Sequence, residues 1–376
     1  MGAYNLQIKR ILLSLAVCLT AAGVGFIISA SAGTGEVAVL SSVNVEIDGR
    51  TTTFNTYEIR GERHIKLRDL AFTLNRTDIR FSVNWDSAEA AIIIKSGGEY
   101  RSVGGEMAVN GRSNKTASRL LAKLYIDDVF RTIPAYIIDG NYYFRLRQIA
   151  MALEIDARWD GRKYIIDPNP TQLKRTADAG QDYIDRIVFI GDSVTYGFQA
   201  YGVLSGGTQT TQVWTPENRT FYLFNQWNIK LYYPETSQNI SVEEAVKLKK
   251  PEYLFITLGT NGISTENEAA FKAHYIDFVS RILETDPGVK IILNTMFPIA
   301  RNYRFQGDIN NSKIDKGNIW IYEIASELGV RCLDTNSILK DSEGWLKPEY
   351  ESGDGLHLTQ IAYLKVLDHI RVHAYK

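Results

Sequence analysis

The sequence predicts a chain of two domains, a β-rich domain followed by an α/β domain whose parallel sheet is covered by helices on both faces. Three observations predict this fold class. The chain has 376 residues, more than one typical domain holds. Short runs of alternating hydrophobic and polar residues, separated by Gly and Asp, fill residues 37–167. From residue 185 onward, short apolar runs alternate with longer helical patterns, as they do in parallel sheets.

Residues 1–32 have the features of a secretory signal peptide. Lys9 and Arg10 precede an apolar stretch that runs to about residue 30, and a small-residue A-x-A site ends at Ala32. We therefore expect a secreted or cell-surface protein with a bacterial-type signal peptide. Because roughly twenty apolar residues also suffice to span a bilayer as a helix, an uncleaved membrane anchor is the alternative.

The charge and cysteine content of the chain bear on two questions: which partners it can bind, and whether disulfides stabilise it. The formal net charge is -1 and there is no block of basic residues, so we do not expect a nucleic-acid partner. Of the two cysteines, Cys18 lies in the signal segment. Only Cys332 would remain after cleavage, which excludes an intramolecular disulfide. Cys332 lies in an apolar run and is predicted to be a buried strand residue.

The first domain contains two similar segments. "IKLRDLA" at 65–71 leads on to Trp85 and Asp86, and "FRLRQIA" at 144–150 leads on to Trp159 and Asp160. Each segment is predicted to be a strand end, a short helix and a second strand. Two copies indicate a duplicated unit, since a solenoid needs more repeats.

These segments, "IKLRDLAFTL" and "FRLRQIAMAL", together with the two Trp-Asp pairs, resemble the copper amine oxidase N-terminal-like domain. That resemblance covers residues 37–167 and implies a small module found on bacterial surface and secreted proteins. His64 is the only histidine of this region, so we expect no copper chemistry in it. We predict a spacer or a module that contacts the cell wall.

Residues 168–184 are predicted to be a linker, because Pro168 and Pro170 each disfavour helix in the preceding residue and lack a backbone donor. The second domain then occupies residues 185–376. Its predicted strands cover residues 187–190, 253–258, 290–296 and 330–333, and its predicted helices cover residues 242–249, 268–284, 314–328 and 359–374. Residues 197–235 are predicted to be a long excursion over the sheet edge.

Three short motifs of the second domain follow predicted strands or lie in the last loop. They are Gly-Asp-Ser-Val at 191–194, Gly-Thr-Asn-Gly at 259–262 and Asp-Gly-Leu-His at 354–357. A serine hydroxyl is a poor nucleophile until an imidazole takes its proton, and that imidazole needs a carboxylate to fix its tautomer. Open α/β sheets bind ligands at the carboxyl ends of their strands. We therefore expect Ser193 at that edge, with Asp354 and His357 beside it.

With these motifs in this order, residues 185–376 resemble an SGNH (GDSL-type) hydrolase. The resemblance implies a three-layer α/β/α, flavodoxin-like domain. It also implies that Ser193 is the catalytic nucleophile, that His357 is the general base and then the acid, and that Asp354 orients His357. The oxyanion hole would contain the backbone N–H of Ser193 and the side-chain amide of Asn261.

Two features depart from the family pattern. The family usually has Asp directly after the motif Asn, whereas Gly262 follows Asn261 here. The family also uses a backbone donor from a Gly between the Ser and Asn motifs. Gly202, Gly206 and Gly207 are available, but none follows an obvious strand, so this donor stays unassigned.

His369 and His373 lie four residues apart on the last predicted helix, a spacing that can bind a metal ion. No carboxylate or cysteine nearby completes a cluster in the sequence. We therefore predict that these histidines face solvent, and we expect neither a metal nor an organic cofactor.

Together these features predict an exported serine esterase that hydrolyses O-acyl esters through an acyl-enzyme. O-acyl groups on cell-wall or extracellular glycans are the favoured substrates, followed by lipid or small-molecule esters. The N-terminal domain would contact the cell wall, and a membrane would be a partner only if the signal segment is uncleaved. Two alternatives stay open: an O-acyltransferase that uses the same triad, and a catalytically inactive surface-binding protein.

Overall fold

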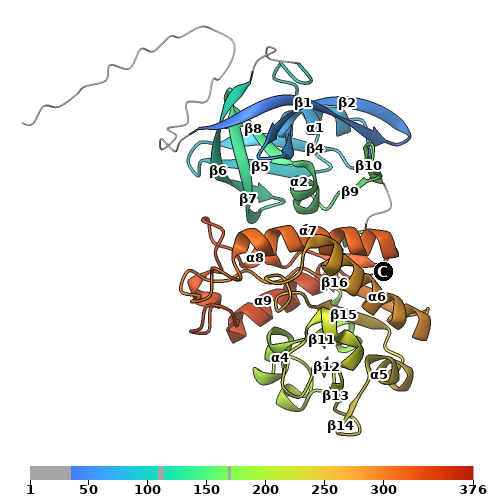
Figure 1. The fold of residues 1–376 in the computed structure, drawn as a ribbon. Helices are drawn as coiled ribbons and strands as arrows, with labels where there is room; N and C mark the ends of the chain where they lie inside the picture. The colour runs from blue at the N-terminus through green and yellow to red at the C-terminus, as the bar shows by residue number, and fades with distance from the viewer. Residues whose placement is uncertain (1–34, 109–113, 168–170, 376) are drawn as a thin grey trace, which may run out of the picture.

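The computed structural model describes residues 35–108, 114–167 and 171–375, and the predicted signal segment 1–32 lies outside them (Figure 1). We refer to residues 35–167 as the N-terminal domain and to residues 171–375 as the C-terminal domain. Within the described residues, no helix combines the length and the apolar character needed to cross a bilayer.

The N-terminal domain is built from one large sheet and two short helices. Its strands are β1 (Glu36–Ile47), β2 (Arg50–Ile59), β3 (Glu62–Lys66), β4 (Phe81–Asp86), β5 (Ala91–Ser96), β6 (Lys115–Ile126), β7 (Val129–Ile138), β8 (Asn141–Arg145), β9 (Asp156–Trp159) and β10 (Tyr164–Asp167), and its helices are α1 (Leu67–Leu74) and α2 (Leu146–Ala152). The strand order is β4-β5-β6-β7-β8-β3-β2-β1-β10-β9. An additional pairing of β1 with β6 closes the six central strands on themselves.

The two halves of this domain repeat one pattern. Three antiparallel strands, a helix and two further strands make up β1 to β5, and the same series recurs in β6 to β10. The last strand of each half pairs in parallel with the first strand of the other, β5 with β6 and β10 with β1. The predicted repeats at 65–71 and 144–150 are the equivalent strand-to-helix junctions of the two halves.

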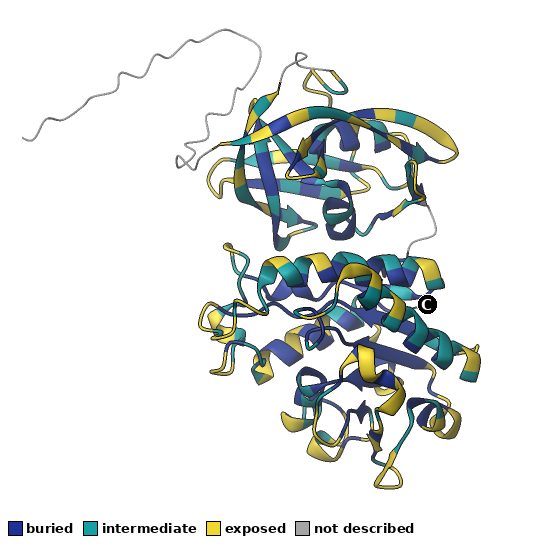
Figure 2. Ribbon diagram, in the orientation of Figure 1, coloured by how far each residue is buried: buried dark blue, intermediate teal, exposed yellow. Residues whose placement is uncertain are grey.

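The C-terminal domain contains a parallel sheet in the order β12-β11-β15-β16-β17. These strands are β11 (Ile187–Gly191), β12 (Val213–Trp214), β15 (Tyr253–Thr257), β16 (Lys290–Asn294) and β17 (Arg331–Leu333). A two-stranded sheet of β13 (Leu231–Tyr233) and β14 (Gln238–Ile240) follows β12. The strands of the parallel sheet are dark blue, that is buried, in Figure 2, and Cys332 lies buried in β17 as predicted.

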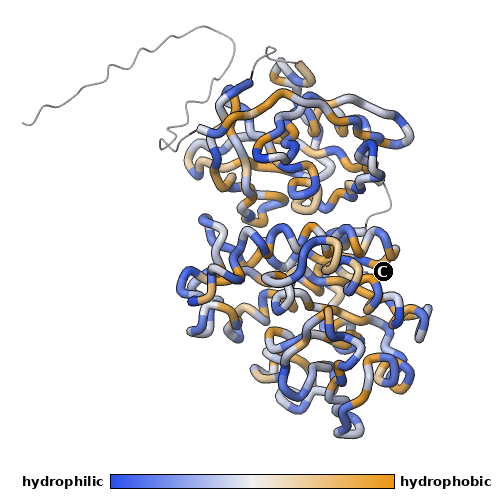
Figure 3. The backbone as a smooth tube through the Cα atoms, viewed as in Figure 1, coloured by the Kyte–Doolittle hydropathy of each residue, from blue (hydrophilic) through white to orange (hydrophobic). Residues whose placement is uncertain are grey.

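Alternate residues of the buried strands belong to two separate cores. In β11, Val188 and Ile190 pack with residues of α5 (Val242–Lys249), α6 (Glu268–Thr285) and α7 (Asn311–Leu328). Ile187 and Phe189 pack instead with residues of α3 (Gly180–Asp185), α4 (Ser193–Ala200), α8 (Asn336–Leu339) and α9 (Gln360–Arg371). Apolar and polar segments alternate along the long helices in Figure 3, as amphipathic helices require.

Several element boundaries differ from those predicted. Helix α7 begins at Asn311, three residues earlier than predicted, because the Asn310 side chain caps it by accepting the N–H of Lys313. The predicted excursion over residues 197–235 contains β12, the edge strand of the sheet. With only two residues, this strand offers no period for a sequence pattern to reveal.

The two domains are joined by buried polar contacts as well as by the chain. The side chain of Arg131, from β7, is only 4 % exposed and bonds to Asp334 (3.4 Å) and to Ser337 of the C-terminal domain. The hydroxyl of Tyr322, on α7, donates to Asp156 and accepts the N–H of Ala157. Each of these groups is buried together with its hydrogen-bond partner from the other domain. The geometry of these bonds therefore defines how the two domains sit relative to each other.

One predicted surface group proved to be part of this interface. His373 is only 3 % exposed, and its Nε2 lies 3.1 Å from Oε1 of Glu154 in the N-terminal domain. Its Nδ1 lies 2.7 Å from the carbonyl oxygen of His369. The prediction that His373 faces solvent was wrong, because the residues just after helix α9 pack against the other domain.

Candidate active site

Ser193 lies where β11 turns into α4, at the carboxyl edge of the parallel sheet. The turn is tight: a Cβ on Gly191 would overlap the Thr195 side chain and lie 2.5 Å from the carbonyl oxygen of Thr257. Asp192 caps the helix by accepting the N–H of Val194 (3.1 Å). As the first residue of α4, Ser193 has a backbone N–H that the helix itself does not use. This N–H can therefore bind a developing negative charge.

Asp354 and His357 lie in one compact loop between α8 and α9. Oδ1 of Asp354 accepts the N–H groups of Leu356 (2.9 Å) and His357 (2.8 Å), and Oδ2 lies 2.6 Å from Nδ1 of the His357 ring. Burial acts to raise the pKa of Asp354, but the hydrogen bonds from the His357 ring and the two N–H groups outweigh it and lower the pKa. The carboxylate is therefore ionised at neutral pH and holds the Nδ1–H tautomer of His357.

The loop brings His357 to Ser193. Nε2 of His357 lies 2.9 Å from the Ser193 hydroxyl oxygen, so Ser193, His357 and Asp354 form a continuous hydrogen-bonded series. The side chains of His357 and Asp354 are 37 % and 53 % exposed. The series therefore lies at an open surface that a bulky substrate can approach.

Asn261 lies beside the Ser193 turn but is already engaged. Its Nδ2 donates to Oδ2 of Asp192 (2.9 Å) and to the carbonyl oxygen of Phe221 (3.3 Å). Both amide N–H groups thus link the Ser193 turn to the loop after β12. The longer bond, to Phe221, is the one that an oxyanion could replace.

A carboxylate is present near Gly262, although the residue itself has none. A Cβ on Gly262 would lie 2.5 Å from Oε1 of Glu266. The other oxygen, Oε2, lies 2.5 Å from Nδ1 of His274. Glu266, four residues further along the chain, therefore occupies the space into which a side chain at position 262 would project.

The glycines considered for the second backbone donor do not reach Ser193. Gly202, Gly206 and Gly207 follow the end of α4, about 12 Å along the helix axis from Ser193. The segment that does approach Asn261 is the loop from 215 to 221 after β12. Sequence reasoning missed this loop because β12 itself was not predicted.

Arg219, in the same loop, is a further candidate that sequence reasoning missed. Its backbone is left-handed, with φ +60°, and its guanidinium carbon lies 3.7 Å from the centroid of the Tyr196 ring. Tyr196 lies three residues after Ser193 on α4, so the two side chains lie on neighbouring parts of the helix surface. Arg219 therefore places a positive charge on the ring of a residue that lies about one helical turn from Ser193.

Asp192 is the buried carboxyl of the site. It is 2 % exposed, and burial raises its pKa to about 7, while the Val194 N–H and the charge on His357 act in the opposite direction. Two donors, from Val194 and Asn261, bind its two oxygens. Both bonds can form in the ionised and in the protonated state, because the hydroxyl oxygen of a neutral carboxyl keeps acceptor capacity.

We predict that Asp192→Asn lowers kcat by about 10- to 100-fold, because the new NH₂ group must face one of the two donors and Asn261 loses its position.

The same substitution should change how the unfolding free energy depends on pH. Wild-type Asp192 has a folded pKa above its unfolded value of 3.8, so its favourable contribution is complete below about pH 4 and is lost as the pH rises through about 7.

Denaturant unfolding from pH 4 to 8 measures this effect. The difference in unfolding free energy between wild type and Asp192→Asn should fall over that range by an amount on the order of 4 kcal/mol. Asp182→Asn, an exposed change on α3, is the matched control and should follow wild type. A constant difference across the range would show that Asp192 does not titrate there.

Comparison with known proteins indicates the enzyme class of the C-terminal domain. Residues 189–364, just under half of the chain, match the model of the GDSL-like Lipase/Acylhydrolase family. This match makes the C-terminal domain that of a carboxylic ester hydrolase. None of the curated proteins matches the chain.

Several solved structures are similar to the C-terminal region. A GDSL-like lipase from Bacteroides thetaiotaomicron is 19 % identical, with a TM-score of 0.31, over 51 % of this chain and 87 % of its own. A lipase/acylhydrolase from Enterococcus faecalis is 18 % identical, with a TM-score of 0.32, over 49 % and 92 %. A carbohydrate esterase of family 3 from Talaromyces cellulolyticus is 14 % identical, with a TM-score of 0.34, over 49 % and 93 %.

Proposed function

We propose that this ester hydrolase is an exported serine esterase that removes O-acyl groups from cell-wall or extracellular glycans. The observation that carries the proposal is the hydrogen-bonded series from the Ser193 hydroxyl through His357 (2.9 Å) to Asp354 (2.6 Å). Export rests on the signal-type sequence of residues 1–32. We likewise infer two domains, at 37–167 and 185–376, with helix α3 of the preceding segment packed against the second domain, and a flavodoxin-like α/β/α layering of the second.

The proposed reaction begins with proton transfer. Nε2 of His357 takes the proton of the Ser193 hydroxyl as its oxygen attacks the ester carbonyl, and Asp354 stabilises the imidazolium that forms. The carbonyl oxygen becomes negative and accepts the Ser193 N–H and one N–H of Asn261, once the latter leaves the Phe221 carbonyl. His357 then gives its proton to the leaving alkoxide, and the acyl group remains on Ser193.

The second half of the reaction uses the same groups with water. His357 removes a proton from water, the resulting hydroxide attacks the acyl carbonyl, and His357 returns the proton to Ser193 as the free acid departs. The exposure of His357 and Asp354 allows water to reach the acyl-enzyme. This observation favours hydrolysis over transfer to a second sugar.

Two features support a large substrate over a small one. The triad lies at an open surface, whereas sites for small molecules bury most of the ligand. Two exposed aromatic residues, Tyr222 and Phe224, lie one and three positions after Phe221 in the chain. The carbonyl oxygen of Phe221 accepts a hydrogen bond from Asn261. Flat rings at the edge of a site provide contact surfaces for the apolar faces of sugars.

Release of free acetate from an O-acetylated oligosaccharide by the full chain tests the proposal. Acetate in solution with no acetyl gain by an added acceptor sugar is the expected result. Acetyl transfer to the acceptor would favour the acyltransferase. The surface-binding alternative would follow if wild type turns over neither O-acetylated sugars nor small aryl esters and Ser193 does not react with a fluorophosphonate.

A further inference from the structure

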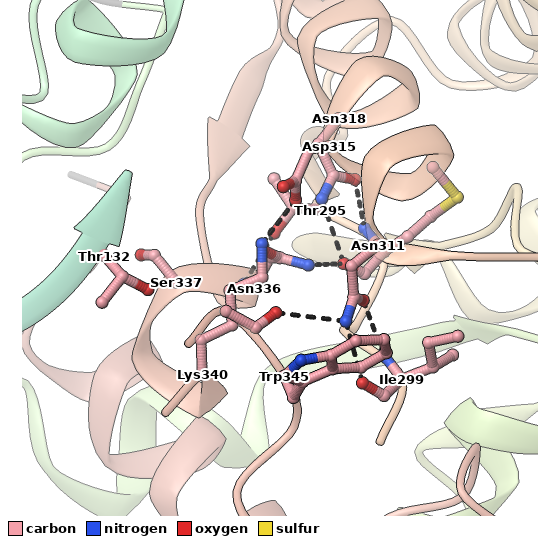
Figure 4. A network of polar contacts seen from close by, with 12 residues as sticks. Thr132, Thr295, Ile299, Asn311, Asp315, Asn318, Asn336, Ser337, Lys340 and Trp345 are labelled. Atoms are coloured by element: carbon pink, nitrogen blue, oxygen red, sulfur yellow. Dashed lines mark hydrogen bonds and ion pairs between the residues drawn. The ribbon is translucent and has the colours of Figure 1, made fainter. Parts of the chain in front are cut away.

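A large cleft lies between the two domains, separate from the Ser193 site. Its volume is about 690 Å³. One wall comes from β3, β6, β7, β8 and α2 of the N-terminal domain, and the other from the first turns of α7 and residues 340–345. Figure 4 shows part of the second wall, with Asn311, Asp315, Lys340 and Trp345 opposite Thr132 of β7.

The acidic side chains that line the cleft are all neutralised within the protein. Glu62 lies 3.6 Å from Arg145, Asp315 lies 2.5 Å from Lys340, and Glu343 lies 2.8 Å from Arg301. The cleft therefore presents no free negative charge from these residues to a ligand.

Two cations of the cleft, in contrast, are unpaired. Arg119, on β6, and Lys316, on α7, have neither a hydrogen bond nor an ion pair with any residue that the structure describes, and they come from opposite walls. The Gln148 amide and the Ser312 hydroxyl also line the cleft without a partner in the described chain. A ligand that satisfies these groups must offer oxygen acceptors and negative charge.

The remaining surface suits a sugar chain. Leu120, Leu121, Pro134 and Trp345 provide apolar surface between the polar groups. Sugars have both apolar faces and dense oxygen acceptors, so they match a lining of this kind better than a purely apolar or purely ionic ligand does.

The cleft is fixed relative to the triad. The side chain of Asn311 bonds to both backbone groups of Ile299 (2.9 Å each) and to the carbonyl oxygen of Gly344 (3.1 Å). The next residue, Ala300, donates its N–H to the carbonyl oxygen of Gly355 (2.8 Å), inside the Asp354–His357 loop. One short segment thus supports a cleft wall and the catalytic loop.

We propose that the interdomain cleft binds an acidic segment of the glycan whose ester is cleaved at Ser193, through charge contacts from Arg119 and Lys316. The inference rests on the proposed function for the identity of the polymer. The recognised group is a sugar-borne anion, either a carboxylate or a phosphodiester.

Calorimetric titration of the full-length Ser193→Ala protein tests the inference without turnover. The probes are oligogalacturonate for the carboxylate, oligo(glycerol phosphate) for the phosphodiester, and maltohexaose as the neutral control. We expect at least one acidic probe to bind and the neutral one not to bind. Adding Arg119→Gln and Lys316→Gln should weaken binding by about tenfold per charge removed.

The matched control carries Lys123→Gln and Lys247→Gln, which remove the same charge from exposed positions on β6 and α5 that do not line the cleft. It should bind like the parent. Introduced into the protein that retains Ser193, Arg119→Gln and Lys316→Gln should leave the rate of p-nitrophenyl acetate hydrolysis unchanged. Equal binding of acidic and neutral probes, or equal loss in both double variants, overturns the inference. Absence of esterase activity in the wild-type protein, with acidic probes still bound in the cleft, would overturn the proposed function alone.

Discussion

Replacing Ser193 with alanine is expected to lower ester turnover by about four orders of magnitude or more while the fold is retained. The Ser193 hydroxyl oxygen lies 2.9 Å from Nε2 of His357, and in the proposed mechanism it is the atom that forms the acyl-enzyme. Without it, catalysis falls to what the oxyanion donors and substrate binding provide. Initial rates on p-nitrophenyl acetate measure the loss, and fluorophosphonate labelling reports the nucleophile directly.

Ser205→Ala is a suitable control for this experiment. Ser205 is an exposed serine of the same domain whose hydroxyl donates to Asp185 (2.6 Å), so its loss should change neither rate nor labelling. If Ser193→Ala keeps a tenth of the wild-type rate, or is still labelled, another residue is the nucleophile.

The second large effect concerns Asp354. Its two oxygens have different tasks, since Oδ1 accepts two backbone N–H groups and Oδ2 faces the His357 ring. In Asp354→Asn, an amide NH₂ that faces the ring forces the tautomer with a proton on Nε2, which cannot accept the Ser193 proton. An NH₂ turned the other way opposes the two N–H groups and disrupts the loop. Either outcome should lower kcat by about 10³- to 10⁴-fold.

Glu351→Gln separates catalysis from loop support. Glu351 accepts the N–H groups of Gly353 (2.5 Å) and Gly355 (2.6 Å) but does not touch His357. We expect it to lower kcat by no more than about tenfold, since only loop order changes. Comparable losses in the two variants, measured as kcat on the same ester, would mean that Asp354 acts only on the loop.

The sequence predicted best what depends on local pattern. The apolar runs at 187–190 and 253–258 were correctly predicted as strands. A strand that is buried on both faces is apolar throughout and shows no alternation of apolar and polar residues. The motifs after them located Ser193 and Asn261 at one sheet edge, and the structure brings His357 and Asp354 there. The assignment of roles to these residues remains a prediction that the experiments above test.

What the sequence could not predict depends on contacts between distant residues. The engagement of Asn261 with Asp192 and Phe221 needs three separate loops to meet. The burial of His373 depends on Glu154, more than two hundred positions away. The contact of Arg219 with the Tyr196 ring depends on the loop after β12, an edge strand of two residues that is too short to show a sequence period.

The buried contacts of Arg131 have a consequence for how the protein unfolds. Its guanidinium lies among Asp334, Ser337 and Glu154, and separation of the domains would break its contacts with Asp334 and Ser337 and leave only Glu154 of its own domain beside it. The contacts between the domains therefore stabilise both of them, and unfolding of either domain removes this stabilisation from the other. We therefore expect the two domains to unfold as one cooperative unit, so that a destabilising substitution in the β-rich domain reduces the population of folded Ser193 sites.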